Sequence, residues 1–376
     1  MNSETSPAFL NPNSPLAPLV LITGCNGLVG SFVAGKFVAE GYRVRGLRRS
    51  GSDLRLVAAF SDRLEWAEGD VLDIPSLEKA LVGVHLVVHA AALVSFAPSD
   101  RARLYRVNVE GTANVVNCCL KAGVPKFCHV SSVAALGQSG PGIIDAQNQR
   151  PEMVTDEEVK WEESPRTGHY ARSKYLAELE VWRGQAEGLK VVVVNPSLVL
   201  GVGDWNRSSA RVFKYLWDEK PFYPPGSVNY VDVRDVAEII FLLTSADIRA
   251  ERYILSAGSI AYRELFDQIA DGFRKLRPRI RVGIAAAELL WRLEWVRSRL
   301  SGKAPLINRE TVRIASRPLR YDNRKIRGEL NYVFRSIDDT VRWCCREFVE
   351  MENKSKQPTP VRDEPPKREP DQDTHS

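Results

Sequence analysis

The chain has 376 residues, 44% of them hydrophobic and 26% charged, which is typical of a soluble globular protein. Its formal charge of +5 comes without zinc-finger spacing or an RNA-binding signature, so we expect no nucleic acid partner. Six cysteines, four of them in adjacent pairs, and five scattered histidines favour reduced thiols, no metal site and a cytoplasmic protein. No signal peptide and no apolar run of about 18 residues is visible, so we expect no integral membrane span.

Composition also divides the chain. Residues 1–16 and 351–376 are polar and poor in large apolar side chains, so we predict a disordered leader and a disordered tail. Between them we expect a main domain over 17–200 and a smaller substrate-binding region over 201–350. Residues 229–255 are expected to return to the main domain.

Short apolar runs alternate with helix-period segments along the main domain. We predict strands at 18–23, 42–47, 63–68, 85–91, 127–131 and 190–195, and helices at 28–40, 74–81, 100–122 and 168–187. A helix at 235–243, a strand at 253–255 and a mostly helical stretch over 260–350 follow. Near-continuous apolar strands separated by helices predict an α/β protein with a doubly wound parallel sheet, the Rossmann fold.

A glycine-rich loop joins the first predicted strand to the first predicted helix. It reads Gly24-Cys25-Asn26-Gly27-Leu28-Val29-Gly30. The first glycine allows a tight turn, the second lets the backbone approach a pyrophosphate, and the third allows close packing of helix on strand. The helix N-terminus presents amide hydrogens to the anion. This position in a βαβ unit predicts a dinucleotide site, with a plain tight turn as the alternative.

Three later strand ends suggest how the cofactor is held. Strand two ends in Arg48 and Arg49 with no carboxylate before Asp53, which favours NADP over NAD because guanidinium pairs with a 2′-phosphate. The alternative is that both arginines face solvent. Asp70 and Val71 end strand three, where an adenine ring would lie. Small residues end strand four and leave room for the central part of the cofactor; they are Ala90, Ala91 and Ala92.

Tyr170 and Lys174 are four residues apart on a predicted helix, so their side chains share one face. A nearby ammonium favours the phenolate, which lets Tyr170 act as an acid or base on an alcohol or carbonyl. Ser132, at the end of strand five, is placed to bond the same oxygen. The chain holds a second Tyr-x-x-x-Lys at Tyr321 and Lys325. We discount it because no strand end with a serine precedes it.

Taken together these motifs resemble the extended short-chain dehydrogenase/reductase family, over residues 18–255 and more weakly to about 345. The resemblance implies that Asn108 supports the active-site geometry and that Ser131 and Asn195-Pro196-Ser197 lie beside the nicotinamide. Tyr230–Ala237 also matches a signature that the family carries late in the chain. The resemblance implies that the chain is an enzyme that binds NADP or NAD. A homodimer through helices 101–122 and 168–187 is compatible with it.

The resemblance is strongest to reductase-like and epimerase-like branches. It favours hydride transfer to or from a secondary alcohol or ketone, with a nucleotide-sugar epimerase holding NAD as the alternative and a non-catalytic sensor behind both. Val133 and Ala134 follow Ser132 where related dehydratases carry carboxylates, which argues against dehydration. The apolar segment 285–296 contains three charges and predicts a buried helix or lid, with peripheral membrane contact as the alternative. Candidate substrate-pocket residues, for which core packing is an equal explanation, are Ser95, Phe96, Trp205, Arg211, Phe213, Phe222 and Tyr223.

Overall fold

The computed structural model describes residues 17–137, 153–164, 167–205, 207–282 and 319–356. Its centre is a seven-stranded sheet in the order β11-β7-β5-β4-β1-β2-β3, with every pair parallel. The predicted doubly wound parallel sheet is confirmed. The strands are β1 (Leu19–Thr23), β2 (Arg43–Arg48), β3 (Leu64–Glu68), β4 (Leu86–His89), β5 (Lys126–Val130), β7 (Val191–Pro196) and β11 (Glu251–Leu255).

Helices cover both faces of this sheet, which explains why β1, β4 and β7 are apolar almost throughout, whereas β2 and β3 near one edge carry several charged side chains. On one face α1 (Leu28–Ala39) and α7 (Val233–Ser245) pack together, with the 3₁₀ helix η1 (Arg55–Arg63) beside α1. On the other face lie α2 (Ile74–Ala80), α4 (Gly111–Ala122) and α5 (His169–Ala186). Two hydrophobic cores therefore enclose the sheet, and the loops at its carboxyl edge stay free to build a site.

The helix predicted at 100–122 is interrupted. After the 3₁₀ turn η2 (Pro98–Asp100) the structure has α3 (Arg101–Tyr105), a π-helical turn η3 (Arg106–Glu110) and then α4. A π turn inserts one residue into the helix and turns the following side chains, and such turns are frequent at functional sites. A single helix was predicted here, because a shift of one residue is hard to tell from ordinary irregularity in the spacing of apolar residues.

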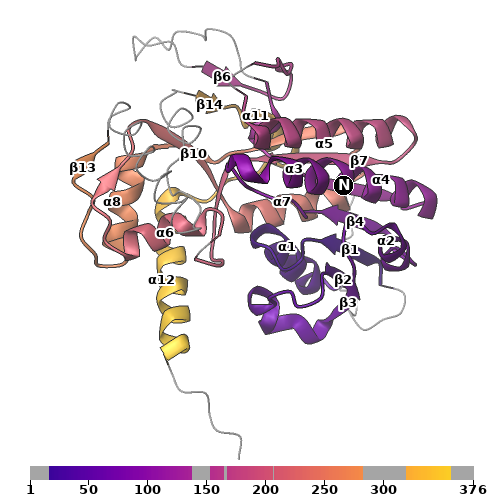
Figure 1. The fold of residues 1–376 in the computed structure, drawn as a ribbon, viewed down its shortest axis with the longest axis horizontal. Helices are drawn as coiled ribbons and strands as arrows, with labels where there is room; N and C mark the ends of the chain where they lie inside the picture. The colour runs from indigo at the N-terminus through magenta and orange to yellow at the C-terminus, as the bar shows by residue number, and fades with distance from the viewer. Residues whose placement is uncertain (1–16, 138–152, 165–166, 206, 283–318, 357–376) are drawn as a thin grey trace, which may run out of the picture.

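A second, smaller group of elements lies beside the large sheet, where Figure 1 shows α6, α8 and α12 together. A three-stranded sheet contains β10 (Ser227–Asp232), parallel to β8 (Leu198–Leu200) and antiparallel to β12 (Gly258–Ala261). The helices α6 (Ala210–Trp217), α8 (Tyr262–Gly272) and α12 (Ile337–Lys356) enclose a third core with it. The chain leaves the large sheet after β7 and returns through α7 and β11.

The remaining elements are short. They are the 3₁₀ turn η4 (Val133–Ala135), the strand pair β6 (Met153–Thr155) with β14 (Leu319–Tyr321), the pair β9 (Phe222–Tyr223) with β13 (Ile280–Arg281), and α11 (Arg324–Leu330). α12 extends to Lys356, so the first residues of the predicted disordered tail are helical; Val349 and Met351 on this helix pack against the third core. The predicted leader and the apolar segment 285–296 lie outside the described residues.

Candidate active site

The glycine loop has the backbone that a pyrophosphate site requires. Gly24 has φ of +68°, and a Cβ there would meet the Ala91 backbone at 2.8 Å, so only glycine fits the turn without strain. A Cβ on Gly30 would collide with the Gly24 carbonyl, which confirms the need for close packing. Gly27 is the N-cap of α1, followed by Leu28 and Val29 in its first turn. Asn26 donates to the Asp53 carbonyl at 3.3 Å and fixes the outer side of the loop.

A buried histidine, which the sequence analysis missed, joins this loop to the rest of the site. His89 Nδ1 lies 2.7 Å from the Thr23 hydroxyl and Nε2 lies 2.9 Å from the Thr112 hydroxyl. Thr112 Oγ1 donates to the Asn108 carbonyl at 2.6 Å, so it must accept from His89 Nε2–H. Nδ1 then accepts from Thr23. Burial and the charge of Lys174 lower the pKa of His89 to about 3, which agrees with this neutral form.

The same tie places the small residues at the end of β4. Thr23 Oγ1 accepts from the Ala91 backbone amide at 3.2 Å, and the Ala90 amide donates to the Thr23 carbonyl at 3.2 Å. Ala90 and Ala91 are half-buried and Ala92 is exposed. The end of β4 is therefore held against the glycine loop at the distance of a backbone hydrogen bond. A signal for His89 was available, since it directly precedes the three alanines.

Asn108 sits in the π turn and is 1% exposed. Its amide accepts from the Leu93 amide at 2.7 Å and donates to the Leu93 carbonyl at 3.0 Å, which fixes the chain that follows β4. It also donates to Ser173 Oγ at 2.9 Å, and Ser173 in turn donates to the Tyr170 carbonyl at 2.8 Å. Asn108 thus orients the first turn of α5 rather than reaching Tyr170 directly.

Ser132 and Tyr170 share a hydrogen bond between their side chains. Ser132 is the N-cap of η4, and its hydroxyl also accepts from the Ala134 amide at 3.2 Å. Burial raises the pKa of Tyr170 above its ordinary value, and the Ser132 hydrogen bond offsets part of that rise. The two hydroxyls form a pair that can hold one substrate oxygen and exchange a proton with it.

Lys174 lies one turn further along α5 and is 2% exposed. Its ammonium donates to the Val130 carbonyl at 3.0 Å. Burial lowers the pKa of Lys174 to about 8, while the charge of Glu178 raises it against that trend. The carbonyl of Val130 leaves further ammonium protons free, so the lysine can donate to a ribose hydroxyl as well.

The residues expected beside the nicotinamide contain buried polar atoms that lack partners within the described chain. These are Ser131 Oγ, Asn195 Oδ1 and Ser197 Oγ, and all three side chains are less than 9% exposed. Buried polar atoms cost free energy unless something bonds them. They lie at the ends of the neighbouring strands β5 and β7, around Pro196. An amide-bearing ring at this edge would satisfy them, so the residues present fit a nicotinamide.

The predicted adenosine end is open and basic. Arg48 stacks over the Trp66 ring at 5.5 Å and its Nε has no hydrogen-bond partner, while Arg49 is exposed. Neither forms an ion pair within the described chain, and Asp53, the first carboxylate after them in the sequence, pairs with Arg55 at 2.6 Å. Asp70 uses one carboxyl oxygen to accept from the Leu72 amide at 3.0 Å. Val71 is buried, and its carbonyl accepts from Asn114 at 3.1 Å.

The candidate substrate residues separate into two groups. Phe96 lies against Tyr170, with ring centroids 5.4 Å apart in an edge-on arrangement, and Ser95 donates to Asp100 at 2.6 Å in the turn before it. Phe213 is fully buried in the third core, and Trp205 packs there against Phe348. Core packing therefore explains both residues, and neither is needed as a pocket residue. Tyr223 also packs on that core and Arg263 covers its ring; Arg211 is half-buried and Phe222 is 37% exposed.

The second tyrosine–lysine pair does not form a dyad. Tyr321 ends β14, whereas Lys325 lies in α11 and pairs with Glu251 at 2.6 Å. Across the described residues, no group of His, Cys, Asp and Glu side chains could hold a metal ion. No helix in that part of the chain is both long and apolar enough to cross a membrane.

This geometry defines a dinucleotide-binding enzyme fold, and comparison with known proteins gives its family. Residues 20–255 match the NAD dependent epimerase/dehydratase family. A Synechocystis sp. protein, whose name marks its dihydroflavonol 4-reductase activity as unproven, is 30% identical over 87% of this chain and 95% of its own. Cinnamoyl-CoA reductase 1 of Oryza sativa subsp. japonica is 34% identical over 72% of this chain and 79% of its own.

Among solved structures, that of gox2253 is 30% identical, covers 89% of this chain and 98% of its own, and superposes with a TM-score of 0.74. The chain belongs to the NAD dependent epimerase/dehydratase family, the extended short-chain dehydrogenases/reductases. It is an NAD(P)-dependent enzyme of that family, and the resemblance read from the motifs is confirmed.

Proposed function

We propose that the chain is an NADP-dependent reductase that interconverts a ketone or aldehyde and the corresponding alcohol. The observation that carries this proposal is the position of Tyr170 and Lys174 on α5, where Lys174 donates to the Val130 carbonyl of β5 at 3.0 Å, two residues before Ser132. When bound, the nicotinamide supplies or accepts the hydride. Ser132 holds the substrate oxygen, and Tyr170 gives it a proton during reduction or takes the proton during oxidation.

The other residues of the site support this chemistry. The Lys174 ammonium favours the phenolate form of Tyr170 and binds the nicotinamide ribose. Asn108 and Ser173 hold the first turn of α5, so that Tyr170 stays at its place on the sheet edge. Arg48 and Arg49, which are free of carboxylates within the described chain, bind the 2′-phosphate of NADP.

The substrate is proposed to carry a flat, apolar group beside the carbonyl. Phe96 presents its ring next to Tyr170 and offers a wall against which such a group stacks. The rice relative is named as a reductase of a cinnamoyl thioester, which is also a flat aromatic carbonyl compound. Val133 and Ala134 supply no carboxylate next to Ser132, so elimination of water is not supported.

The alternative is a nucleotide-sugar epimerase, which the family name includes. The fate of the cofactor distinguishes the two. We would purify the protein, identify any bound dinucleotide, and then supply NADPH or NADH with aromatic aldehydes, ketones and UDP-sugars. Steady consumption of NADPH with a carbonyl substrate is the expected result. Tightly retained NAD, no net consumption and inversion of a sugar carbon would replace the reductase proposal with the epimerase.

We also propose a homodimer through α4 and α5. The resemblance to family members that pair through the corresponding helices supports this contact, and Leu179 of α5 is 44% exposed. Sedimentation of the wild-type chain and of a Leu179→Glu variant tests the contact. A monomeric wild type, or a variant that still dimerises fully, would refute it.

A further inference from the structure

Three ionisable residues follow one another on the inner face of α5 at intervals of four: Tyr170, Lys174 and Glu178. Glu178 is 1% exposed, hardly more than a core residue. A buried carboxylate is expensive unless it is paired and hydrogen-bonded. The proposed reaction assigns roles to the first two residues and none to the third, so the contacts of Glu178 call for an explanation.

Glu178 connects the sheet edge to the catalytic serine. Its Oε1 accepts from Asn195 Nδ2 at 2.5 Å, and the same Asn195 nitrogen donates to the Ser132 carbonyl at 2.9 Å. Asn195 therefore bridges β7 and the backbone that carries the Ser132 hydroxyl. Without an acceptor on its far side, this amide could turn away from Ser132.

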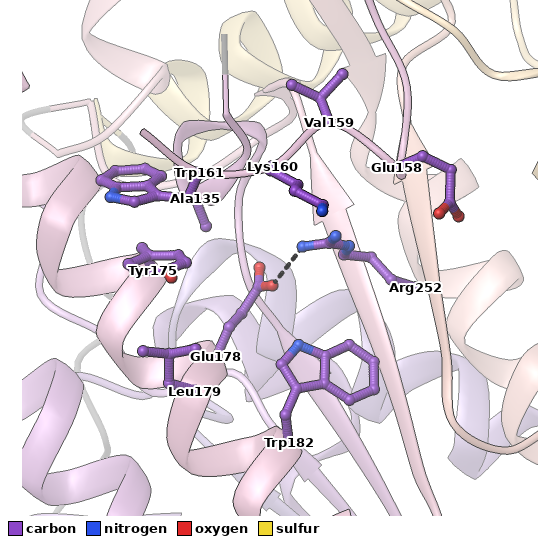
Figure 2. Close-up of a pocket in the computed structure, with 10 residues that line it drawn as sticks. All are labelled: Ala135, Glu158, Val159, Lys160, Trp161, Tyr175, Glu178, Leu179, Trp182 and Arg252. Carbon is purple, nitrogen blue, oxygen red and sulfur yellow. Dashed lines mark hydrogen bonds and ion pairs between the residues drawn. The ribbon is translucent and has the colours of Figure 1, made fainter. Parts of the chain in front are cut away.

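The second oxygen of Glu178 pairs with Arg252 at 3.2 Å, and Figure 2 shows the guanidinium facing the carboxylate. Arg252 belongs to β11 and also donates to the Glu157 carbonyl at 2.7 Å. Glu157 in turn accepts from the Ile254 amide of the same strand at 2.8 Å. The carboxylate is thus fixed from outside by a strand that returns to the sheet late in the chain.

The charges around Lys174 give Glu178 a second effect. His89 on β4 and His129 on β5 lie close to Lys174, and burial together with its charge lowers the pKa of both rings, so they stay neutral. Tyr170 on α5 is a neutral phenol at rest. Within the described chain, Glu178 is the group whose charge raises the pKa of the buried lysine. It keeps the ammonium charged where burial would favour the neutral amine.

We infer that Glu178 is a positioning residue that acts through two neighbours: it holds Ser132 through Asn195, and it supplies the counter-charge of Lys174. The inference rests on the proposed reductase function for its kinetic consequence. Its structural consequence, a Lys174 that titrates at a higher pH than it would without the charge of Glu178, does not depend on turnover. The two can therefore fail separately.

The surroundings of Glu178 make a charge-removing variant feasible. A pocket of about 380 Å³ reaches Glu178 and Arg252 from the outer side of α5, between Lys160, Trp161 and Trp182 (Figure 2). The Arg252 side chain is 24% exposed there. Its guanidinium is hydrated after the loss of its partner instead of being stranded in the core, so we expect Glu178→Gln to fold.

The test compares Glu178→Gln with Glu180→Gln, which removes a carboxylate from the surface of the same helix, where Glu180 pairs with Arg183. We expect the pH above which kcat/KM for carbonyl reduction falls to be about one unit lower in Glu178→Gln than in wild type. The deficit should be about fivefold near pH 8, approach tenfold by about pH 9 and almost vanish at pH 6. Glu180→Gln should follow the wild-type profile. A uniform loss at every pH would indicate a purely structural role and overturn the counter-charge inference.

Two further measurements keep the outcomes separate. Titration of Lys174 by NMR of ¹³C-lysine-labelled protein should show a lower midpoint in Glu178→Gln than in wild type; equal midpoints would refute the inference even if the enzyme reduces no carbonyl. Glu178→Asp keeps the charge but shortens the reach to Asn195. It should retain the wild-type Lys174 midpoint with kcat lowered at all pH values. Full kcat in Glu178→Asp would refute the inference that Glu178 positions Ser132. If Glu178→Gln fails to fold, this variant alone tests that point.

Discussion

The carboxyl edge of the large sheet and the third core are built on different principles. At the sheet edge, side chains such as His89, Asn108 and Asn195 each bond two or more partners at distances set by strand ends. In the third core, Trp205 and Phe213 pack mainly through aromatic contacts, such as those of both rings with Phe348. Hydrogen bonds require partners in particular directions, whereas apolar packing requires mainly a matching volume. A substitution that conserves side-chain volume should therefore be tolerated in the core, but not at the sheet edge.

The largest expected effect is at the sheet edge. Tyr170→Phe removes the hydroxyl that exchanges the proton, and we expect kcat for NADPH-dependent carbonyl reduction to fall by about 10²–10⁴-fold. Steady-state kinetics measure it. Tyr321→Phe is the matched control, because the other Tyr-x-x-x-Lys pair is split between β14 and α11 and should retain full kcat. Full turnover by Tyr170→Phe would exclude the proposed role.

The next effect belongs to the core. Phe213 is fully buried between Phe273 and Phe348, so Phe213→Ala should lower the free energy of unfolding by about 3–5 kcal/mol. KM for substrate should stay unchanged in the folded protein. Denaturant unfolding and kinetics measure the two quantities. Lys220→Ala, at an exposed position just after the same helix, is the surface control and should stay within about 0.5 kcal/mol of wild type. A raised KM with unaltered stability would instead indicate that Phe213 lines the substrate pocket.

Two buried histidines at one register give a comparison within the sheet. His89 is bonded at both nitrogens, whereas both nitrogens of its neighbour His129 have no partner in the described chain. Burial lowers the pKa of each in the folded state, so the unfolded chain binds more protons below pH 6.5 and stability falls as the pH falls. Each buried histidine should lower the free energy of unfolding at pH 5 by about 2 kcal/mol relative to its value at pH 7.5.

Replacing each ring separates these contributions. His129→Phe should change the free energy of unfolding little at pH 7.5. It should remove about 2 kcal/mol of the loss of stability between pH 7.5 and pH 5. His89→Phe leaves the Thr23 and Thr112 hydroxyls without their partner and should cost about 1–3 kcal/mol already at pH 7.5. Urea unfolding at both pH values measures this. Identical costs for the two variants at pH 7.5 would contradict the difference in bonding.

The smallest effect is expected at the adenosine end. Arg49→Ala removes one exposed guanidinium from the end of β2 and should raise KM for NADPH about tenfold, the loss of one charge-assisted contact to the 2′-phosphate. KM for NADH should not change. Arg55→Ala is the control, because it removes an equal charge nearby that is already paired with Asp53. Equal changes for both cofactors would argue against 2′-phosphate binding.

Much of the fold followed from patterns that are local in sequence. The glycine loop, the apolar strands and the spacing of Tyr170 and Lys174 depend on neighbours a few residues away, and the predicted strands of the large sheet lie within a residue or two of the observed ones. The π turn at Asn108 and the three-stranded sheet of β8, β10 and β12 were not predicted. The three-stranded sheet arises from pairing between segments that are distant along the chain.

By itself, the sequence determined the doubly wound sheet, the cofactor class and the residues at the strand ends, because strand order and handedness bring those ends to one edge. Only the tertiary structure decided what holds them there. His89 joins Thr23 to Thr112 across gaps of 66 and 23 residues, and Arg252 reaches Glu178 across 74. Such pairs leave no periodicity to detect, and the aromatic residues of the third core look the same in sequence whether they line a pocket or fill it.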